Sequence, residues 1–307
     1  MEKIKKSILL LFLVFLGCSK SSVENPDKTP KAVDKTANLL GTGQSARDLL
    51  SNDKFSKLKI EIGYVDGFRP TQEAIGAFVD FLNQRTFKES IEVVYNRLES
   101  PGEESLTVDK ISDLEEDNRT IYNEGDTMAV FIYFSDAPAE GDDEDEGLVT
   151  LGAVYRNTSM IIHEVTVRKL AGQSIFISNA QVELATLNHE FGHLFGLVNL
   201  GTDPINDHED VERDTNGDPV IDGDGNTTGN SHCSVDGCLM RAQLQFGGPS
   251  SKAASLLEKS GNSLDVACAL SGQSVLKMLE HQASKGISAP PGLDSECLLD
   301  LASQGGR

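Results

Sequence analysis

Two histidines four residues apart, His189 and His193, are the clearest chemical feature of the sequence. Apolar residues around them recur at spacings of three and four, which predicts a helix with one buried face. These residues are Leu184, Leu187, Phe191, Leu194 and Val198. On such a helix both imidazoles project from the same side, one turn apart, and can bind one metal ion. Glu190 then lies beside the ion, where its carboxylate can accept a proton from water.

Zinc suits this pattern because neutral imidazole is one of its preferred ligands. Zinc lowers the pKa of bound water towards ~7 and polarises a carbonyl, while a neighbouring carboxylate acts as general base. We therefore expect one catalytic zinc ion, with Glu190 as the catalytic residue, and hydrolysis of peptide bonds. The alternative is a helix on which these residues lie by chance, but four of the six histidines fall between His189 and His232.

The continuation of the motif resembles the metzincin signature, His-Glu-x-x-His-x-x-Gly followed three residues later by a third histidine. Gly196 matches the glycine, but Asn199 occupies the position of the third histidine. Asparagine is a poor zinc ligand beside imidazole, so the third ligand must come from elsewhere. The run from His232 to Met240 is similar to the archaemetzincin branch, where a histidine precedes a C-x4-C-x-M run.

This resemblance implies that His232 is the third zinc ligand and that Met240 forms the Met-turn beneath the metal. Long insertions before the third histidine also occur in metzincins of the leishmanolysin type, so residues 200–231 are interpreted as an insertion. His208 is the alternative third ligand, and a glutamate such as Glu209 is the ligand expected of a gluzincin. Met240 is followed by arginine rather than by the tyrosine of some metzincins, so the oxyanion partner is not assigned.

The first residues have the layout of a secretory signal. Lysines precede an unbroken apolar run from Ile8 to Leu16, which is too short to span a bilayer of ~30 Å as a helix. Leu16-Gly17-Cys18 resembles the lipobox of bacterial lipoproteins, which implies cleavage before Cys18 and acylation of that cysteine. Residues 57 to 245 also resemble membrane metalloproteases of Bacteroidetes bacteria that are predicted lipoproteins. We expect export and lipid anchoring to a bacterial membrane, at the periplasmic face or cell surface; an ordinary signal peptide is the alternative.

The composition limits the partners. The 307 residues carry a formal net charge of −21, which makes a nucleic-acid partner improbable because such a partner needs a basic surface. The expected partners are a peptide or protein substrate and the membrane, through lipid on Cys18. The sequence does not indicate the oligomeric state.

Four cysteines remain after Cys18, an even number in a compartment that permits disulfides. They are Cys233, Cys238, Cys268 and Cys297. Archaemetzincins complete a second, all-cysteine zinc site with a later C-x-x-C, whereas Cys268 and Cys297 stand far apart in the sequence. Disulfides are therefore the favoured use of these residues, with three connectivities left open.

Inside the insertion, residues 214–218 and 222–226 place side-chain oxygens at alternate positions, as calcium loops do. Neither segment completes an EF-hand, because Pro219 and Thr227 occupy the position where glycine is required. Two interpretations of residues 214–226 stay open, a Ca²⁺ site that orders the loop delivering His232 and a flexible acidic loop.

Strand-like and helix-like segments alternate before the histidine helix, which predicts an α/β (α+β) domain. By resemblance this is a metzincin-like zincin domain with a mixed twisted sheet, a backing helix and an active-site helix. Strands are expected at 58–65, 91–95, 128–134, 148–155 and 159–167, and helices at 71–82 and 108–114. The expected organisation is a signal peptide at 1–17, a flexible tether at 18–52, a metallopeptidase domain at 53–249 and a mostly helical C-terminal portion at 250–307.

The favoured function is a membrane-tethered zinc endopeptidase. A catalytically silent, metal-containing surface lipoprotein that acts as a binding module is the alternative. Glu190 favours the enzyme, because a purely structural metal site does not require it. Gly152 to Tyr155 is either an edge strand that pairs with substrate or an internal strand, and His163 is expected to be a packed histidine.

Overall fold

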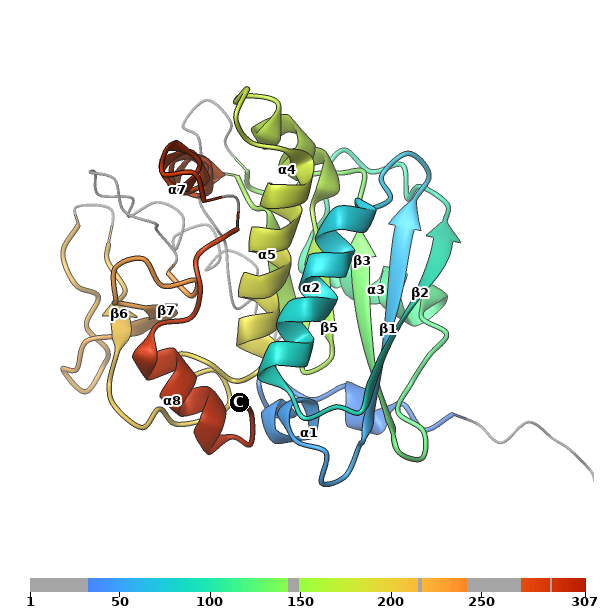
Figure 1. Cartoon of the computed structure of the whole chain (residues 1–307), viewed down its shortest axis with the longest axis horizontal. Helices are drawn as coiled ribbons and strands as arrows, with labels where there is room; N and C mark the ends of the chain where they lie inside the picture. The colour runs from blue at the N-terminus through green and yellow to red at the C-terminus, as the bar shows by residue number, and fades with distance from the viewer. Residues whose placement is uncertain (1–32, 143–148, 215–216, 242–271, 288) are drawn as a thin grey trace, which may run out of the picture. The chain divides into compact units, whose positions relative to one another are not determined.

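The computed structural model describes residues 33–142, 149–214, 217–241, 272–287 and 289–307. The predicted signal sequence, Cys18 and Cys268 lie outside these residues. Figure 1 shows a central sheet with helices packed on it, and an insertion and two late helices beside the helix that carries the histidines.

The central sheet has five strands and is mostly parallel. β1 pairs in parallel with β2 and β3, β3 pairs in parallel with β5, and only β4 runs antiparallel, beside β5. The prediction of a mixed α/β fold is therefore confirmed. In spatial order the strands are β2 (Ser90–Leu98), β1 (Lys57–Val65), β3 (Thr127–Phe134), β5 (Ser159–Ile162) and β4 (Gly152–Arg156).

Both faces of the sheet are covered by helices. Ile132 belongs to the core cluster that includes α2 (Gln72–Arg85) and α5 (Asn179–Leu194). Its neighbour Tyr133 points to the other face and packs in the cluster that includes α3 (Val108–Asn118). Because successive side chains of a strand alternate and both faces are covered, β3 is apolar and buried at every position after Thr127.

Local sequence signals fix the ends of α5. Ser178 and Gln181 form a reciprocal capping box at its start, which satisfies two backbone N–H groups that lack helical partners. The helix ends at Leu194, and Gly196 adopts a φ of +75°, a conformation that glycine reaches without strain. The turn at Gly196 then leads the chain away from the helix.

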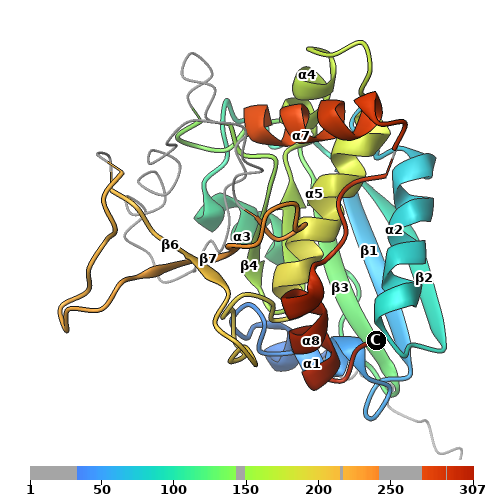
Figure 2. The same ribbon diagram turned by 60° about the vertical axis from the view of Figure 1, so that its left-hand side comes forward.

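The insertion and the C-terminal segment lie together at one side of α5. β6 (Glu209–Val211) and β7 (Gly229–Cys233) form an antiparallel ribbon. Figure 2 shows α7 (Gly272–Ser284) crossing the upper end of α5 and α8 (Ser295–Ser303) beside its lower end. Within the described residues of 250–307, the chain is thus largely helical.

Two segments differ from expectation. The tether was predicted to extend to residue 52, but residues 36–38 form a 3₁₀ turn and α1 (Ala46–Leu50) buries Leu49 and Leu50 in the core. Those two leucines supply the apolar surface that the polar residues before them lack. The strand predicted at 159–167 ends at Ile162, and α4 (Glu164–Ala171) begins two residues later.

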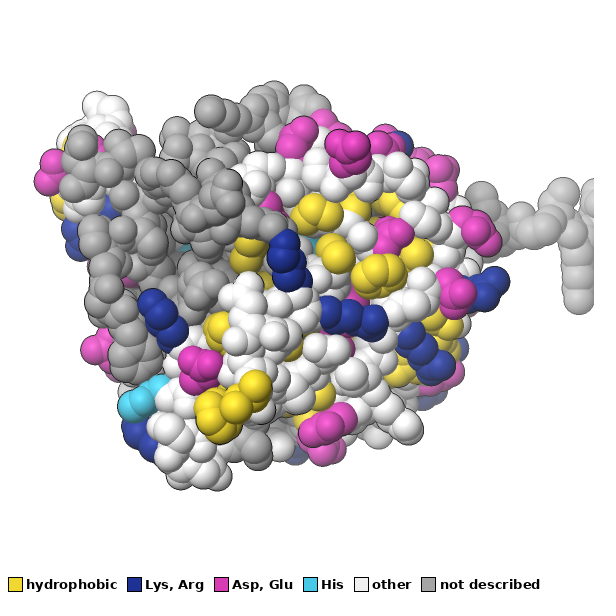
Figure 3. Space-filling view, turned by 90° about the horizontal axis from the view of Figure 1, so that it is seen from above, with side chains coloured by type: hydrophobic (Ala, Val, Ile, Leu, Met, Phe, Trp, Pro, Cys, Tyr) yellow, Lys and Arg dark blue, Asp and Glu magenta, His cyan; other side chains and the backbone are white. Residues whose placement is uncertain are grey.

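None of the described helices has the length and apolarity needed to cross a bilayer. On the face in Figure 3, acidic side chains are interspersed with isolated basic ones, and no continuous basic patch is visible among the residues described there.

Two buried carboxyl groups meet between α4 and α5. Glu164 accepts from Arg168 Nε at 2.5 Å, while Glu183 accepts from the backbone N and Oγ1 of Thr71 at 2.8 and 2.6 Å. Both glutamates are fully buried. Burial, and next the neighbouring Glu183, raises the pKa of Glu164 from 4.5 to about 8.

This pair predicts a pH-dependent stability. Between about pH 4.5 and about pH 8 the unfolded chain ionises Glu164 while the folded chain keeps it protonated, so the free energy of unfolding falls as pH rises. The slope attributable to one such group is at most ~1.4 kcal/mol per pH unit. Urea unfolding across this range should show a shallower decline for Glu164→Gln than for wild type. The exposed Glu116→Gln is the control, and equal slopes in all three proteins would contradict the assignment.

Candidate metal centre

His189 and His193 lie one turn apart on α5, as their spacing predicts. Their Nε2 atoms are 3.1 Å apart, and both side chains are buried. Two nitrogens bound at 2.0–2.1 Å to one tetrahedral ion lie ~3.3 Å from each other, so the pair fits a shared zinc ion without rearrangement of the helix.

His232 approaches this pair from β7. Its ring is stacked on His189 with centroids 5.4 Å apart, and lies edge-on to His193 at 5.3 Å. One ring nitrogen from each of the three histidines lies within 4.8 Å of the others. Ser231, immediately before His232, has a φ of +60°, which turns the chain at the position that brings the imidazole to α5.

Backbone carbonyls orient two of the three rings. Nδ1 of His189 lies 2.7 Å from the Leu239 carbonyl oxygen, and Nδ1 of His232 lies 2.7 Å from that of Asn230. A carbonyl only accepts, so each Nδ1 carries the hydrogen and donates it. The Nε2 lone pairs then face the centre of the cluster, which is the arrangement of metal-binding histidines.

The cluster holds its imidazoles neutral. Burial, with His232 as a lesser cause, lowers the pKa of His189 to about 3, and burial lowers that of His232 to about 4. Burial likewise places the pKa of His193 well below its ordinary value. Since a metal binds the unprotonated nitrogen, these side chains need no deprotonation near neutral pH before they bind a cation.

Glu190 lies beside the histidines on the same helix and is fully buried. Strand β4 runs against it, since a Cβ atom on Gly152 would lie 3.0 Å from Glu190 Cγ and 2.8 Å from Thr186 Cγ2. Glycine therefore allows the strand to approach the helix at this point. Among the described strands β4 pairs only with β5, so it is one of the two edge strands of the sheet, opposite β2.

Met240 packs directly beneath the helix. A Cβ atom on Gly192 would collide with Met240 Sδ and lie 2.9 Å from Cε, so only glycine leaves room for this methionine. The residue before it, Leu239, provides the carbonyl that binds His189. The turn from Cys238 to Met240 therefore supports the histidine pair through both packing and a hydrogen bond.

The other predicted candidates lie apart from the three imidazoles. The Asn199 amide and the backbone N of Ser231 both donate to the Glu209 carboxylate, so Glu209 joins the two ends of the insertion. His163 is packed, and its Nδ1 lies 2.9 Å from the Ala137 carbonyl oxygen. His208 binds elsewhere, with Nε2 2.8 Å from Asp300 Oδ2.

Two aspartates of the acidic loop at 214–226 use their carboxylate oxygens to accept backbone hydrogen bonds within tight turns. Asp214 Oδ1 accepts from the backbone N of Asp218 at 2.9 Å, and Asp222 Oδ1 accepts from those of Asp224 and Asn226 at 2.9 and 2.8 Å. Among the described residues, the groups of clustered metal donors do not include this loop. Calcium binding there stays a prediction.

The C-terminal portion contributes side chains that sequence reasoning missed. Cys297 was named only as a disulfide candidate, and Asp294 and Asp300 were not singled out, yet all three lie beside His208 and Cys233. Asp294, Cys297 and Asp300 are three residues apart, which places them along one face of α8 and its N-terminal cap. This spacing is the sequence feature that could have indicated a shared role. The disulfide interpretation is also wrong for the described cysteines, because Cys233, Cys238 and Cys297 are free thiols in the structure.

Comparisons with known proteins give little further information. No protein-family model matches the chain, and no curated protein matches it. Among solved structures, the crystal structure of archaemetzincin from Methanopyrus kandleri is similar, with a TM-score of 0.43 and 15% sequence identity, over 81% of this chain and 96% of that chain. These values are too low to support a conclusion about function, which we draw from the geometry of the site.

Substituting alanine for glycine should have opposite effects on stability at Gly192, which contacts Met240, and at Gly76, which faces open space. Gly192→Ala should destabilise the fold by roughly 1–3 kcal/mol, because the new methyl group overpacks Met240. Gly76→Ala is the control: a Cβ there meets nothing within 4 Å, so it should stabilise α2 by about 0.5–1 kcal/mol. Thermal unfolding in the presence of zinc measures both.

A double-mutant cycle tests the contact itself. The loss of stability in the double variant Gly192→Ala, Met240→Ala should be smaller than the sum of the losses in the two single variants. The shortened side chain at position 240 makes room for the new methyl group at position 192, and that methyl group fills part of the cavity. Additive effects would show that Met240 and Gly192 do not interact.

Proposed function

We propose that the chain is a zinc-dependent peptidase whose metal ligands are His189, His193 and His232. The observation that carries this proposal is the convergence of three buried, neutral imidazoles, two from one helix and one from a segment about forty residues later, with a glutamate next to the first. Three nitrogen ligands leave one position of a tetrahedral ion for water or substrate, which is typical of catalytic rather than structural zinc sites.

The residues of the chain have distinct roles in this proposal. Bound zinc would supply Lewis acidity, which acidifies water and polarises the scissile carbonyl. Glu190 is the general base that takes the proton from the attacking water and passes it to the leaving amine. Met240 and the Leu239 carbonyl position the histidines but do not contact the substrate.

Strand β4 is the element proposed to bind the substrate. It is an edge strand of the described sheet and passes Glu190 at Gly152, so a peptide in extended conformation can pair with its backbone beside the general base. Such pairing recognises the backbone of a peptide rather than its side chains. The proposed substrate class is therefore extended peptide or protein segments.

One observation favours the second candidate function, a catalytically silent metal protein that acts as a binding module. The three histidines are at most 4% exposed, and Glu190 and β4 are buried as well. A substrate reaches such a site only after neighbouring segments move. The same burial would favour catalysis once a substrate is bound, because it excludes water and strengthens electrostatic interactions. Burial therefore does not separate the two functions, and a cleavage experiment does.

The decisive variant is Glu190→Gln, which preserves shape and removes the base. We expect it to bind zinc as the wild type does and to lose about 10²- to 10⁴-fold in the rate of casein or peptide cleavage. The exposed Glu73→Gln is the matched control and should cleave at the wild-type rate. Wild-type cleavage by Glu190→Gln would overturn the mechanism, and no cleavage by the wild type with zinc bound would favour the binding module.

Two histidine variants separate the candidate third ligands. His232→Ala should lose zinc from the three-imidazole site and lose cleavage. His208→Ala removes an imidazole that lies outside that site, so it should retain a three-histidine centre. If His208→Ala abolished zinc binding there while His232→Ala retained it, the ligand assignment would be reversed.

We also propose that the chain is exported and tethered to a bacterial membrane through lipid on Cys18. The support is the sequence alone, namely the apolar run that ends at Leu16-Gly17-Cys18. A Cys18→Ser variant expressed in a bacterium should move from the membrane fraction to the soluble fraction. Equal membrane association of both proteins would contradict lipidation at this residue.

A further inference from the structure

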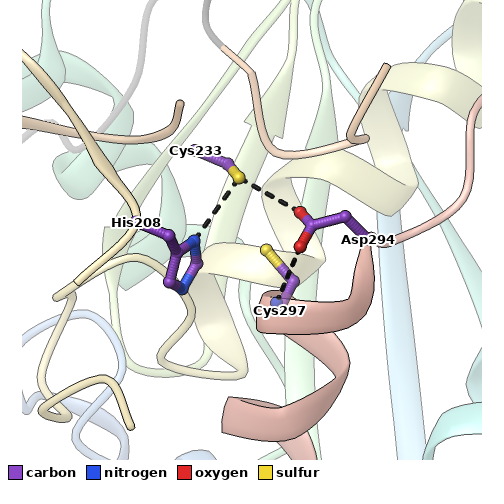
Figure 4. A group of neighbouring side chains, drawn as sticks. All are labelled: His208, Cys233, Asp294 and Cys297. Atoms are coloured by element: carbon purple, nitrogen blue, oxygen red, sulfur yellow. Dashed lines mark hydrogen bonds between the residues drawn. The ribbon is translucent and has the colours of Figure 1, made fainter. Parts of the chain in front are cut away.

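A second cluster of metal-binding side chains lies outside the three-imidazole site. His208, Cys233, Asp294 and Cys297 each offer a donor atom, and these atoms lie within 4.8 Å of one another (Figure 4). We propose that this cluster is a structural binding site for a second divalent, thiophilic metal ion such as zinc. Its donors come from the insertion, from β7 and from α8, three segments that are distant in sequence.

The donor distances fit a tetrahedral ion. His208 Nδ1 lies 3.4 Å from Cys233 Sγ, and two such atoms on one zinc ion are ~3.5 Å apart for Zn–N and Zn–S bonds of ~2.0 and ~2.3 Å. Cys238 Sγ lies 3.6 Å from Cys297 Sγ, against ~3.8 Å for two sulfurs on one ion. Donors at these separations bind an ion with little movement.

The groups around the cluster are those that a thiolate-imidazole site needs. Nε2–H of His208 donates to Asp300 at 2.8 Å, which leaves Nδ1 as the lone pair facing Cys233. The backbone N of Val235 lies 3.4 Å from Cys233 Sγ, and that of Met240 lies 3.3 Å from Cys238 Sγ. Cys233 and Cys238 thus each receive a hydrogen bond from the residue two positions later, which stabilises negative charge on sulfur.

Two residues compete for the fourth position beside His208, Cys233 and Cys297. Cys238 is the softer donor and its Sγ lies 3.6 Å from Cys297 Sγ, but it lies outside the group whose donor atoms are all within 4.8 Å of one another. Asp294 has Oδ2 3.1 Å from Cys233 Sγ, while its Oδ1 already caps α8 by accepting from the backbone N of Glu296 at 2.7 Å. Either choice differs from the all-cysteine pattern expected of the archaemetzincin branch.

The second ion would fix the position of His232. Cys233 is the next residue after His232, so holding its sulfur holds the end of β7. His208 comes immediately before β6, which means that one ion closes the insertion at both ends and attaches it to α8. We infer that the second metal ion organises the third imidazole of the first site without touching it.

Cobalt distinguishes the two sites in the intact protein. A Co²⁺ ion with thiolate ligands gives a sulfur-to-metal charge-transfer absorption in the near ultraviolet, whereas the three-imidazole site contains no sulfur. Metal-free wild-type protein, kept reduced, should take up two equivalents of Co²⁺, one for each cluster, and develop this absorption. His193→Ala should lose one equivalent but keep the absorption.

Variants of the second cluster should lose the charge-transfer absorption that His193→Ala keeps. Cys297→Ser and His208→Ala should lose the charge-transfer absorption, while His281→Ala, which removes a histidine outside both clusters, should keep it. A weaker charge-transfer absorption in Cys238→Ser, where one sulfur fewer binds the ion, assigns Cys238 as the fourth ligand. An unchanged absorption in Cys238→Ser together with weaker Co²⁺ binding by Asp294→Asn assigns Asp294. A wild-type protein with no such absorption would overturn the proposal, even if every variant failed to fold.

A thiol measurement on the wild type alone provides a second test. Bound Zn²⁺ should protect Cys233 and Cys297 from alkylation, and chelation should expose them, as read by mass spectrometry of peptides. A disulfide between Cys238 and Cys297 in the zinc-loaded protein would contradict the site.

The coupling between the sites has its own readout. In Cys297→Ser, the affinity of the three-imidazole site for Co²⁺ should fall about 10- to 100-fold, the range typical when a group behind a ligand is lost. An unchanged affinity of the three-imidazole site would refute the coupling between the sites. It would not contradict the proposal that the second cluster binds a metal ion. Neither result depends on hydrolysis, so failure of the proposed peptidase function would be seen separately, in Glu190→Gln.

Discussion

The hydrogen bond between His189 Nδ1 and the Leu239 carbonyl joins the two parts of the chain on which the site depends. On one side is α5, whose ends are set by a capping box and a glycine turn and whose face is packed on the sheet. On the other is the short turn from Cys238 to Met240, which lies against Gly192 because that residue has no side chain. This bond sets the tautomer of His189 and fixes the distance between helix and turn, so the return of the chain after the insertion is held at a defined place beneath the imidazoles.

The insertion is the costly element of this architecture, because residues 200–231 must begin and end close together. Glu209 joins Asn199 to Ser231, and the ribbon of β6 and β7 pairs Glu209 with Cys233. His208, which binds Asp300, and Cys233, which donates to Asp294 at the start of α8, add a third connection. Closure of a flexible loop of this length costs several kcal/mol of chain entropy, and a metal ion that links its ends offsets part of that cost.

Sequence patterns predicted most of the fold and the placement of His189 and His193 on one helix. The alternation in β1 and β3 and the spacing of apolar residues around His189 located these elements because each signal is local and repeated. The expectation that Met240 lies beneath the metal ligands came only from a resemblance, and its contact with Gly192 was not predicted, since no periodicity connects residues so far apart. The role of α8 was missed because Cys297 and Asp300 lie at ordinary helical spacing, and their meaning appears only when α8 lies against the insertion. Likewise, α1 was taken for tether because two buried leucines are too few to form a pattern.

The central claim is that three imidazoles from α5 and β7 hold one metal ion. Anomalous diffraction from crystals of the zinc-loaded chain, recorded above and below the zinc absorption edge, tests it most directly. The account predicts a zinc peak bonded to Nε2 of His189, His193 and His232, at ~2.0–2.1 Å from each nitrogen. A zinc-loaded crystal with no peak among these three residues, or with a peak that involves His208 in place of His232, would contradict it.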